Sequence, residues 1–255
     1  MATQLEQATA FTRLHVPGDP VLLFNIWDAG SAKVVAACGA KALATGSWSV
    51  AAAHGYEDGE ALPLDLALAN CQRIVAAVEL PVSLDLESGY GREPGAVGET
   101  VSRAIAAGAV GCNLEDQIIG GEGMYAIDAQ ATRIGAAHRA ADDAGIPVFI
   151  NARTDVFLLA EPSAHDRRLL EQTMQRAIAY CDAGASGIFV PGLVDEALIE
   201  DFCRSCPVPV NVMSLDAQPQ VQRLAALGVA RISAGPAPYR LVMKALEAAA
   251  RAAYS

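Results

Sequence analysis

The amino-acid sequence predicts a (β/α)8 barrel that forms a single domain over residues 1–255. Eight short apolar runs follow one another at similar spacing, and Ala-rich amphipathic segments separate them. No GxGxxG dinucleotide motif follows the first run. Alternation of strand and helix implies parallel strands, and eight near-equal units favour a closed barrel over an open doubly wound sheet.

The predicted strands are rich in Val, Ile, Leu and Phe. They cover residues 21–28, 42–47, 81–88, 111–116, 147–154, 187–192, 207–213 and 230–235. Helical segments follow Pro63 and Pro94 and begin again at Leu169, and glycines close them before the next strand, as in AAGAVGCNL and DAGASGIFV.

The last segment, residues 237–255, is predicted to be a helix. Its apolar stripe consists of Leu241, Val242, Ala245, Leu246 and Ala249. The stripe could pack on its own barrel or on that of a partner.

The chain is acidic, with 18 Lys and Arg against 29 Asp and Glu and a formal net charge of −11. This balance repels nucleic-acid phosphates and anionic lipid headgroups, so we expect neither nucleic acid nor a membrane as a partner. An anionic substrate would also be repelled overall. Binding one therefore requires a local positive centre, such as a metal ion or a buried arginine.

The amino-terminal segment lacks a basic stretch followed by an apolar one, and no run of 18 apolar residues occurs, so a cytoplasmic location is expected. The six cysteines lie in apolar surroundings, and Cys203 and Cys206 form a single CxxC before Pro207. A redox or metal site is one interpretation of that pair. We favour reduced, structural thiols.

Polar residues follow the predicted strands at the end where a parallel barrel carries its active site. They are Trp27 and Asp28 after the first strand, Thr45, Gly46 and Ser47 after the second, Asp85 and Glu87 after the third, Glu115 and Asp116 after the fourth, and Asn151, Arg153, Thr154 and Asp155 after the fifth.

Three of these carboxylates predict a metal site. Asp85 and Glu87 are two residues apart on one strand and share a face, and Glu115 on the adjacent strand can approach them. Carboxylates this close repel one another unless a cation neutralises them. Oxygen ligands without His or Cys suit Mg²⁺ or Mn²⁺ better than zinc, and some of them can act through bound water.

Arg153 is the only basic residue at the end of any of the first five strands. Its guanidinium matches a carboxylate in bidentate geometry, so we assign it to a substrate carboxylate. The competing interpretation is a structural ion pair with Asp155 or Glu115, and the two roles could coexist. The mouth acids could likewise pair with Arg92 or Arg103 at the rim.

Several motifs, in order along the chain, resemble the isocitrate lyase and phosphoenolpyruvate mutase superfamily. They are WDAGSA (27–32), GYEDGE (55–60), SLDLESGYG (83–91), NLED (113–116), NARTD (151–155) and NVM (211–213). The resemblance implies a barrel whose last helix is exchanged between neighbouring subunits in a dimer of dimers. It also implies Mg²⁺ bound to the 2-oxo and carboxylate oxygens of a pyruvate-like or oxalate-like unit.

The resemblance also assigns residues to roles. It places the metal ligands at Asp85, Glu87 and Glu115, with Asp85 also facing the substrate, and the groups that grip a carboxylate or enolate at Thr45, Gly46 and Ser47. Trp27, Asp58, Arg153 and Asn211 fall on substrate-pocket positions. Asp58 could be a base or orient the substrate, so Asp58 and Arg153 are the catalytic candidates.

Two features depart from the family pattern. The family's DxD is Asp85-Leu86-Glu87 here, which lengthens one ligand by a methylene group. The segment QIIGGEGMYAID after NLED has neither the KKCGH loop, whose cysteine is the general acid of the lyases, nor the KTNS-like loop of the mutase. We expect this glycine-rich loop to be a gate.

The loop's Glu122 and Tyr125 are either proton donors or solvent-facing residues. His54 is either an acid or base or a surface residue.

The expected function is that of a Mg²⁺-dependent carbon–carbon lyase or decarboxylase. Its substrate would be a small 2-oxo or 2-hydroxy di- or tricarboxylic acid, cleaved through an enolate that the metal and amide donors stabilise. The alternatives are a hydrolase of the P–C bond of a phosphonopyruvate-like substrate, and a 2-oxo-acid-binding protein with little catalysis.

Overall fold

The structure is a computed structural model, which describes residues 2–216 and 220–255. Its strands are β1 (Val21–Leu23), β2 (Leu43–Ala44), β3 (Val82–Asp85), β4 (Gly111–Glu115), β5 (Phe149–Arg153), β6 (Gly187–Phe189), β7 (Val210–Met213) and β8 (Arg231–Ser233). They pair in parallel in the order β1-β8-β7-β6-β5-β4-β3-β2. The Ile26 amide donates to the Ala44 carbonyl (2.9 Å) and a parallel bridge joins Ile26 to Thr45, so the barrel closes between β1 and β2.

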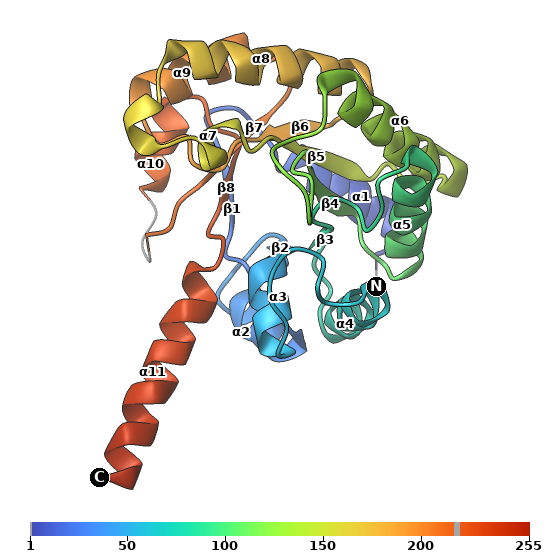
Figure 1. The fold of residues 1–255 in the computed structure, drawn as a ribbon. Coiled ribbons are helices and arrows are strands. Elements are labelled where there is room, and N and C mark those ends of the chain that lie inside the picture. Colours follow the sequence, from blue (N-terminus) through green and yellow to red (C-terminus); the bar gives the residue numbers. More distant parts are fainter. Residues whose placement is uncertain (1, 217–219) are drawn as a thin grey trace.

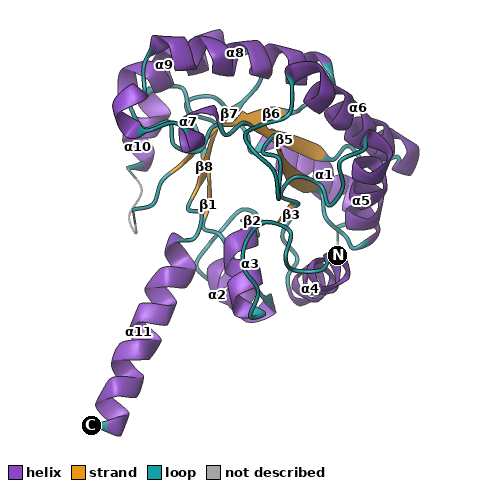
Figure 2. Cartoon of the chain, in the orientation of Figure 1, coloured by secondary structure: helices purple, strands orange, loops and turns teal. Residues whose placement is uncertain are grey.

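Helices surround the strands, as Figures 1 and 2 show. They are α1 (Gln4–Arg13), α2 (Ala29–Ala37), α3 (Ser47–Ala53), α4 (Leu64–Ala77), α5 (Pro94–Ala106), α6 (Ile127–Ala144), α7 (Val156–Leu159), a short 3₁₀ turn η1 (Pro162–Ala164), α8 (Arg167–Asp182), α9 (Glu196–Ser205), α10 (Val221–Ala226) and α11 (Ala237–Tyr254). The predicted (β/α)8 barrel is confirmed.

The strands lie where the sequence predicts them but end earlier. The second strand stops at Ala44, and α3 already begins at Ser47. The third stops at Asp85, and Glu87 adopts the left-handed conformation (φ 51°). The residues at these strand ends turn into the barrel mouth, so they leave the sheet before the apolar pattern ends.

Helix α1 was not predicted, and it covers the amino-terminal end of the barrel. A capping box between Thr3 and Glu6 starts the helix. Its buried Phe11 meets Phe149 of β5 edge to face at 5.8 Å, and the ring of His15 stacks on Phe149 at 3.8 Å. These three rings fill the bottom of the barrel.

The thiols are free, and most are packed. Cys203 and Cys206 are partly buried against the main apolar core. Burial raises the pKa of the Cys203 thiol to about 12 and that of Cys206 to about 11, which makes both unreactive. Among the described residues no helix is long and apolar enough to cross a membrane.

Helix α11 extends away from the barrel (Figure 1). Pro238 is its only buried residue among those described. Leu241, Val242 and Leu246 of the predicted stripe are 47–57% exposed. A free apolar stripe on an 18-residue helix favours the exchange between subunits that the resemblance implies, and this exchange stays a prediction.

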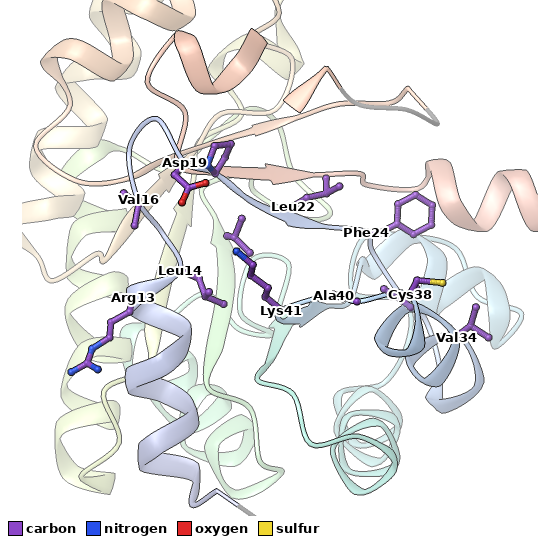
Figure 3. Close-up of a pocket in the computed structure, with 14 residues that line it drawn as sticks. Arg13, Leu14, Val16, Asp19, Leu22, Phe24, Val34, Cys38, Ala40 and Lys41 are labelled. Atoms are coloured by element: carbon purple, nitrogen blue, oxygen red, sulfur yellow. The ribbon is translucent and has the colours of Figure 1, made fainter. Parts of the chain in front are cut away.

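A groove of about 590 Å³ lies beside β1 and α2 (Figure 3). Its apolar lining includes Leu22, Phe24, Val34 and Val35. In a (β/α)8 barrel the helix that follows the last strand packs beside the first strand and first helix of the barrel. Because α11 leaves this place open in its own barrel, we expect the groove to receive α11 of a neighbouring subunit.

Replacing Leu246 with Glu should separate the subunits, because it puts a charge into the predicted contact. We expect wild type to be an oligomer in light-scattering chromatography and L246E to have the mass of a smaller assembly. Y254E, which adds the same charge outside the stripe at the 92% exposed end of α11, is the control and should keep the wild-type mass. An unchanged mass for L246E would contradict the exchange.

His15 should make stability fall as the pH is lowered. Burial and the charge of Arg231 lower the pKa of His15 to about 3. In the unfolded chain the pKa of His15 is near 6.5, so the unfolded chain binds a proton over a pH range where the folded protein does not. The contribution of neutral His15 to stability is therefore fully present above pH 6.5 and is lost progressively below it. Between pH 7 and 5 the loss should be about 2 kcal/mol. Urea unfolding of wild type and H15F at both pH values measures it, and equal losses in the two proteins would refute this account.

Candidate active site

The predicted site residues meet at the carboxyl ends of the strands. Asp85 ends β3 and pairs with Asn113, while Glu115 ends β4 and pairs with Arg153 at the end of β5. The barrel therefore brings the acidic groups of neighbouring strands into one mouth.

Asp85 is oriented by the turn after β2. Its backbone amide donates to the Thr45 hydroxyl (2.9 Å), and its Oδ2 accepts from the Ser47 amide (3.0 Å). Within the part of the chain that the structure describes, its Oδ1 accepts only from the Glu87 amide, at 3.4 Å. The side chain is half-buried, so Oδ1 keeps lone pairs for a further partner.

The Glu87 carboxylate is held by the loop of residues 55–60. Its Oε2 accepts from the amides of Gly59 (2.8 Å) and Glu60 (2.6 Å). Burial and the charge of Asp85 raise the pKa of Glu87 to about 7, and the hydrogen bond from Glu60 opposes that rise. Both Glu87 and Glu60 have positive φ, which costs backbone strain in a residue other than glycine.

Arg153 is surrounded by acids. Its Nη1 lies 2.8 Å from Glu115 Oε2, and its Nε and Nη2 donate to the two oxygens of Asp155 at 2.6 and 2.8 Å. Burial raises the pKa of Glu115, and the Arg153 guanidinium opposes that rise. The structure thus contains both ion pairs of the competing interpretation, and the role of Arg153 in substrate binding stays a prediction.

Asp58 lies exposed at the rim, close to Ser47 and Asp85. Desolvation in the mouth and the charge of Asp85 raise the pKa of Asp58, while a hydrogen bond from Ser47 lowers it. The carboxylate is thus closer to accepting a proton at neutral pH than a free one is.

The other predicted pocket residues line different parts of the barrel. The Trp27 ring meets Tyr239 edge to face at 5.1 Å, at the start of α11. Asn211 lies deeper, where its Nδ2 donates to Ser233 Oγ (3.1 Å). Gly46 precedes the first turn of α3.

Comparisons with known proteins identify the family. A sequence profile described as phosphoenolpyruvate phosphomutase matches residues 11–254. The chain belongs to the phosphoenolpyruvate mutase and isocitrate lyase superfamily. It is 34% identical to the uncharacterized protein Rv1998c of Mycobacterium tuberculosis (strain ATCC 25618 / H37Rv) over 95% of this chain and 88% of that one. It is 28% identical to 2-methylisocitrate lyase of Escherichia coli (strain K12) over 81% of this chain and 73% of the relative.

Comparison with solved structures finds the same fold. A candidate phosphonomutase from Burkholderia cenocepacia J2315 superposes with a TM-score of 0.96 at 52% identity, covering 98% of this chain and 100% of that one. A phosphonopyruvate hydrolase in complex with oxalate and Mg²⁺ shares the fold, with a TM-score of 0.82 at 22% identity over 94% of this chain and 84% of that one. These relatives include lyases, mutases and hydrolases, so family membership leaves the reaction open.

The loop after β4 in this superfamily member forms a small hairpin. Gln117 and Met124 pair as an antiparallel bridge, and Ile119 lies next to Gly59 of the loop that holds Glu87. Glu122 is exposed at the tip. The Tyr125 ring lies under the Arg133 guanidinium, 4.1 Å from its centroid, so one side of Tyr125 is already covered.

The mouth differs from a cage of three direct carboxylate ligands. Among the described residues, no three Asp, Glu, His or Cys side chains converge closely enough to surround one ion. Glu87 is bound by two amides and Glu115 by Arg153, whereas Asp85 Oδ1 is nearly free. The donor chemistry of these carboxylates fits a hard cation.

The sequence analysis gave no positioning role to two residues that support the site. Asp116 is completely buried, and its oxygens accept from Tyr180, Arg176 and the Asp155 amide at 2.7–3.1 Å. Tyr90 covers Glu87 with its hydroxyl at 3.5 Å. The partners of Asp116 lie far away in sequence. The weak signal was that Asp116 and Asp155 each follow a strand directly.

Replacing Arg176 with Met should destabilise the protein by about 3 kcal/mol, because it leaves the Asp116 charge buried without its cation. The matched control is R167M, which removes the partner of Asp201 in an exposed ion pair and should cost less than about 1 kcal/mol. Urea unfolding at pH 7 measures both. Equal effects would show that Asp116 does not depend on Arg176.

Proposed function

We propose that this protein is a Mg²⁺-dependent enzyme, with Mn²⁺ as a possible substitute, that cleaves a carbon–carbon bond of a small 2-oxo or 2-hydroxy di- or tricarboxylic acid through an enolate. The observation that carries the proposal is the half-buried Asp85 carboxylate, oriented by Thr45 and Ser47 beside Glu87 and Glu115. Oxygen donors of this kind favour a hard cation. The related phosphonopyruvate hydrolase with oxalate and Mg²⁺ supports the same cofactor.

In this proposal Asp85 would hold the cation, and Glu87 and Glu115 would help to hold it, directly or through bound water. When bound, Mg²⁺ would stabilise the negative charge of an enolate oxygen as a Lewis acid. The protein supplies the hydrogen-bond donors. From the turn of Thr45, Gly46 and Ser47, the Gly46 amide and the Ser47 hydroxyl would donate to the carboxylate or enolate, because the amides of Thr45 and Ser47 already donate to Ser83 and Asp85. Such donors act strongly where water is excluded.

Residues around the barrel mouth would transfer protons, add positive charge and line the substrate pocket. Asp58, whose pKa is raised, accepts a proton on its carboxylate or orients the hydroxyl of a 2-hydroxy acid. Arg153 keeps Glu115 and Asp155 in place and adds positive charge beside a substrate carboxylate. Trp27 and Asn211 complete the pocket. We expect the enzyme to act in the cytoplasm as a homotetramer, a dimer of dimers.

Chemistry at a P–C bond is the second candidate, because the structure that shares 52% identity is a candidate phosphonomutase. A phosphonate group would require additional cationic donors near the gate. The described gate residues 117–128 include no Lys or Arg, which favours the carboxylic acid.

Turnover of a substrate panel tests the proposal. Purified protein with Mg²⁺ should convert at least one of methylisocitrate, isocitrate, oxaloacetate and related 2-oxo or 2-hydroxy acids, and EDTA should abolish the reaction. Products are followed by NMR. Turnover of phosphonopyruvate alone would favour the second candidate, and binding without turnover would indicate a binding protein.

Replacing Asp85 with Asn should weaken Mg²⁺ binding by more than the ten- to hundred-fold that removal of an outer ligand typically costs, because the direct ligand loses its charge. Calorimetric titration with Mg²⁺ measures the affinity. E99Q, which neutralises an exposed carboxylate on α5, is the control and should bind as wild type does. Equal affinity in D85N and wild type would remove Asp85 from the metal site.

A further inference from the structure

Arg231 of β8 is completely buried inside the barrel. Its Nη2 lies 3.3 Å from Asn113 Oδ1 on β4, and its Nε lies 3.4 Å from Ser233 Oγ. Strands β8 and β4 are four places apart in an eight-stranded barrel, so the side chain crosses the interior from one wall to the opposite one.

The guanidinium lies in the floor beneath the carboxylates of the mouth. Its partner Asn113 pairs in register with Asp85 and precedes Glu115 by two residues on the same face of β4. The charge of Asp85 raises the pKa of Arg231, although burial lowers it overall to about 10, so the group stays protonated at neutral pH. Because Asn113 bonds to Arg231 and is the strand partner of Asp85, only one residue separates the two charges, and the field of Arg231 reaches Asp85.

Among the described residues, two buried atoms beside Asn113 have no hydrogen-bond partner. One is Nη1 of Arg231 and the other is Oδ1 of Asn151, whose Nδ2 donates to the same Asn113 oxygen (2.9 Å). Within the described chain Arg231 also forms no ion pair with a carboxylate. A buried charge without a counterion is costly, so its presence calls for a compensating anion.

The other buried guanidinium groups have partners for their donors. The Arg153 guanidinium forms ion pairs with Glu115 and Asp155. Arg133, outside the barrel, donates to the carbonyls of Ser88, Gly91 and Arg92. An acidic protein that binds an anion needs a local positive centre, and Arg231 is the cation inside the described barrel whose charge no carboxylate neutralises.

We propose that Arg231 is the fixed positive charge that favours a dianionic carboxylate ligand in this barrel, acting through its field from the floor of the site. The inference rests on the proposed function, because it assumes that the mouth binds such a ligand. Arg231 is a positioning residue in this account, since it needs no contact with the reacting atoms. It attracts the anion and repels the cation, so its two effects on binding have opposite signs.

Opposite effects on anion binding and on cation binding distinguish this role of Arg231 from a purely structural one. We would measure oxalate binding in the presence of Mg²⁺ by calorimetry, and Mn²⁺ binding without oxalate by electron paramagnetic resonance. The variants are R231M and R231Q, which are neutral, and R231K, which keeps the charge. S233A removes a hydrogen bond of Arg231 without changing the charge. R231Q can still bond to Asn113, so it serves if R231M fails to fold.

We expect the neutral variants to bind oxalate about ten-fold or more weakly and Mn²⁺ as tightly as wild type or more tightly. R231K should restore oxalate binding to within about three-fold, and S233A should stay within about two-fold for both ligands. Oxalate affinity unchanged in the neutral variants, or oxalate and Mn²⁺ weakened alike, would overturn the inference alone. A wild-type protein that binds Mn²⁺ but not oxalate would overturn the proposed function together with it.

Discussion

Repulsion among the carboxylates of one barrel mouth is the constraint on which the site depends. Asp85, Glu87 and Glu115 end up close together because their strands are neighbours in a parallel barrel. Each carboxylate is held in place by a different set of partners. Asp85 is fixed by the turn after β2, Glu87 by two backbone amides, and Glu115 by Arg153. This arrangement leaves Oδ1 of Asp85 with only one weak hydrogen bond, and it is there that we propose a cation.

The supports of these carboxylates come from segments far apart in the chain. The loop of residues 55–60 reaches over to Glu87 and adopts positive φ at Glu60 to present two amides. The buried Asp116 connects the start of the gate to α8 and to the Asp155 that holds Arg153. Loss of one support would therefore displace more than one functional carboxylate.

Much of the fold could be predicted from the sequence, because alternating apolar strands and glycine-closed helices specify a barrel locally. The meeting of Asp85, Glu87 and Glu115 also followed from strand order. The partners of Glu87 and Asp116 could not be foreseen, since they depend on loop conformation and on contacts over dozens of residues. Arg231 lies within an apolar strand, where one sequence alone gives no reason to separate a core residue from a functional one.

A site that stabilises an enolate should also speed hydrogen exchange at the carbon next to a carbonyl, and this exchange can be measured without knowledge of the natural substrate. Pyruvate would be incubated in D₂O with protein and Mg²⁺, and loss of the methyl proton signal followed by NMR. The account predicts exchange faster than with Mg²⁺ alone, and suppression of that exchange by EDTA. Exchange no faster than in the protein-free control, with pyruvate demonstrably bound, would contradict it.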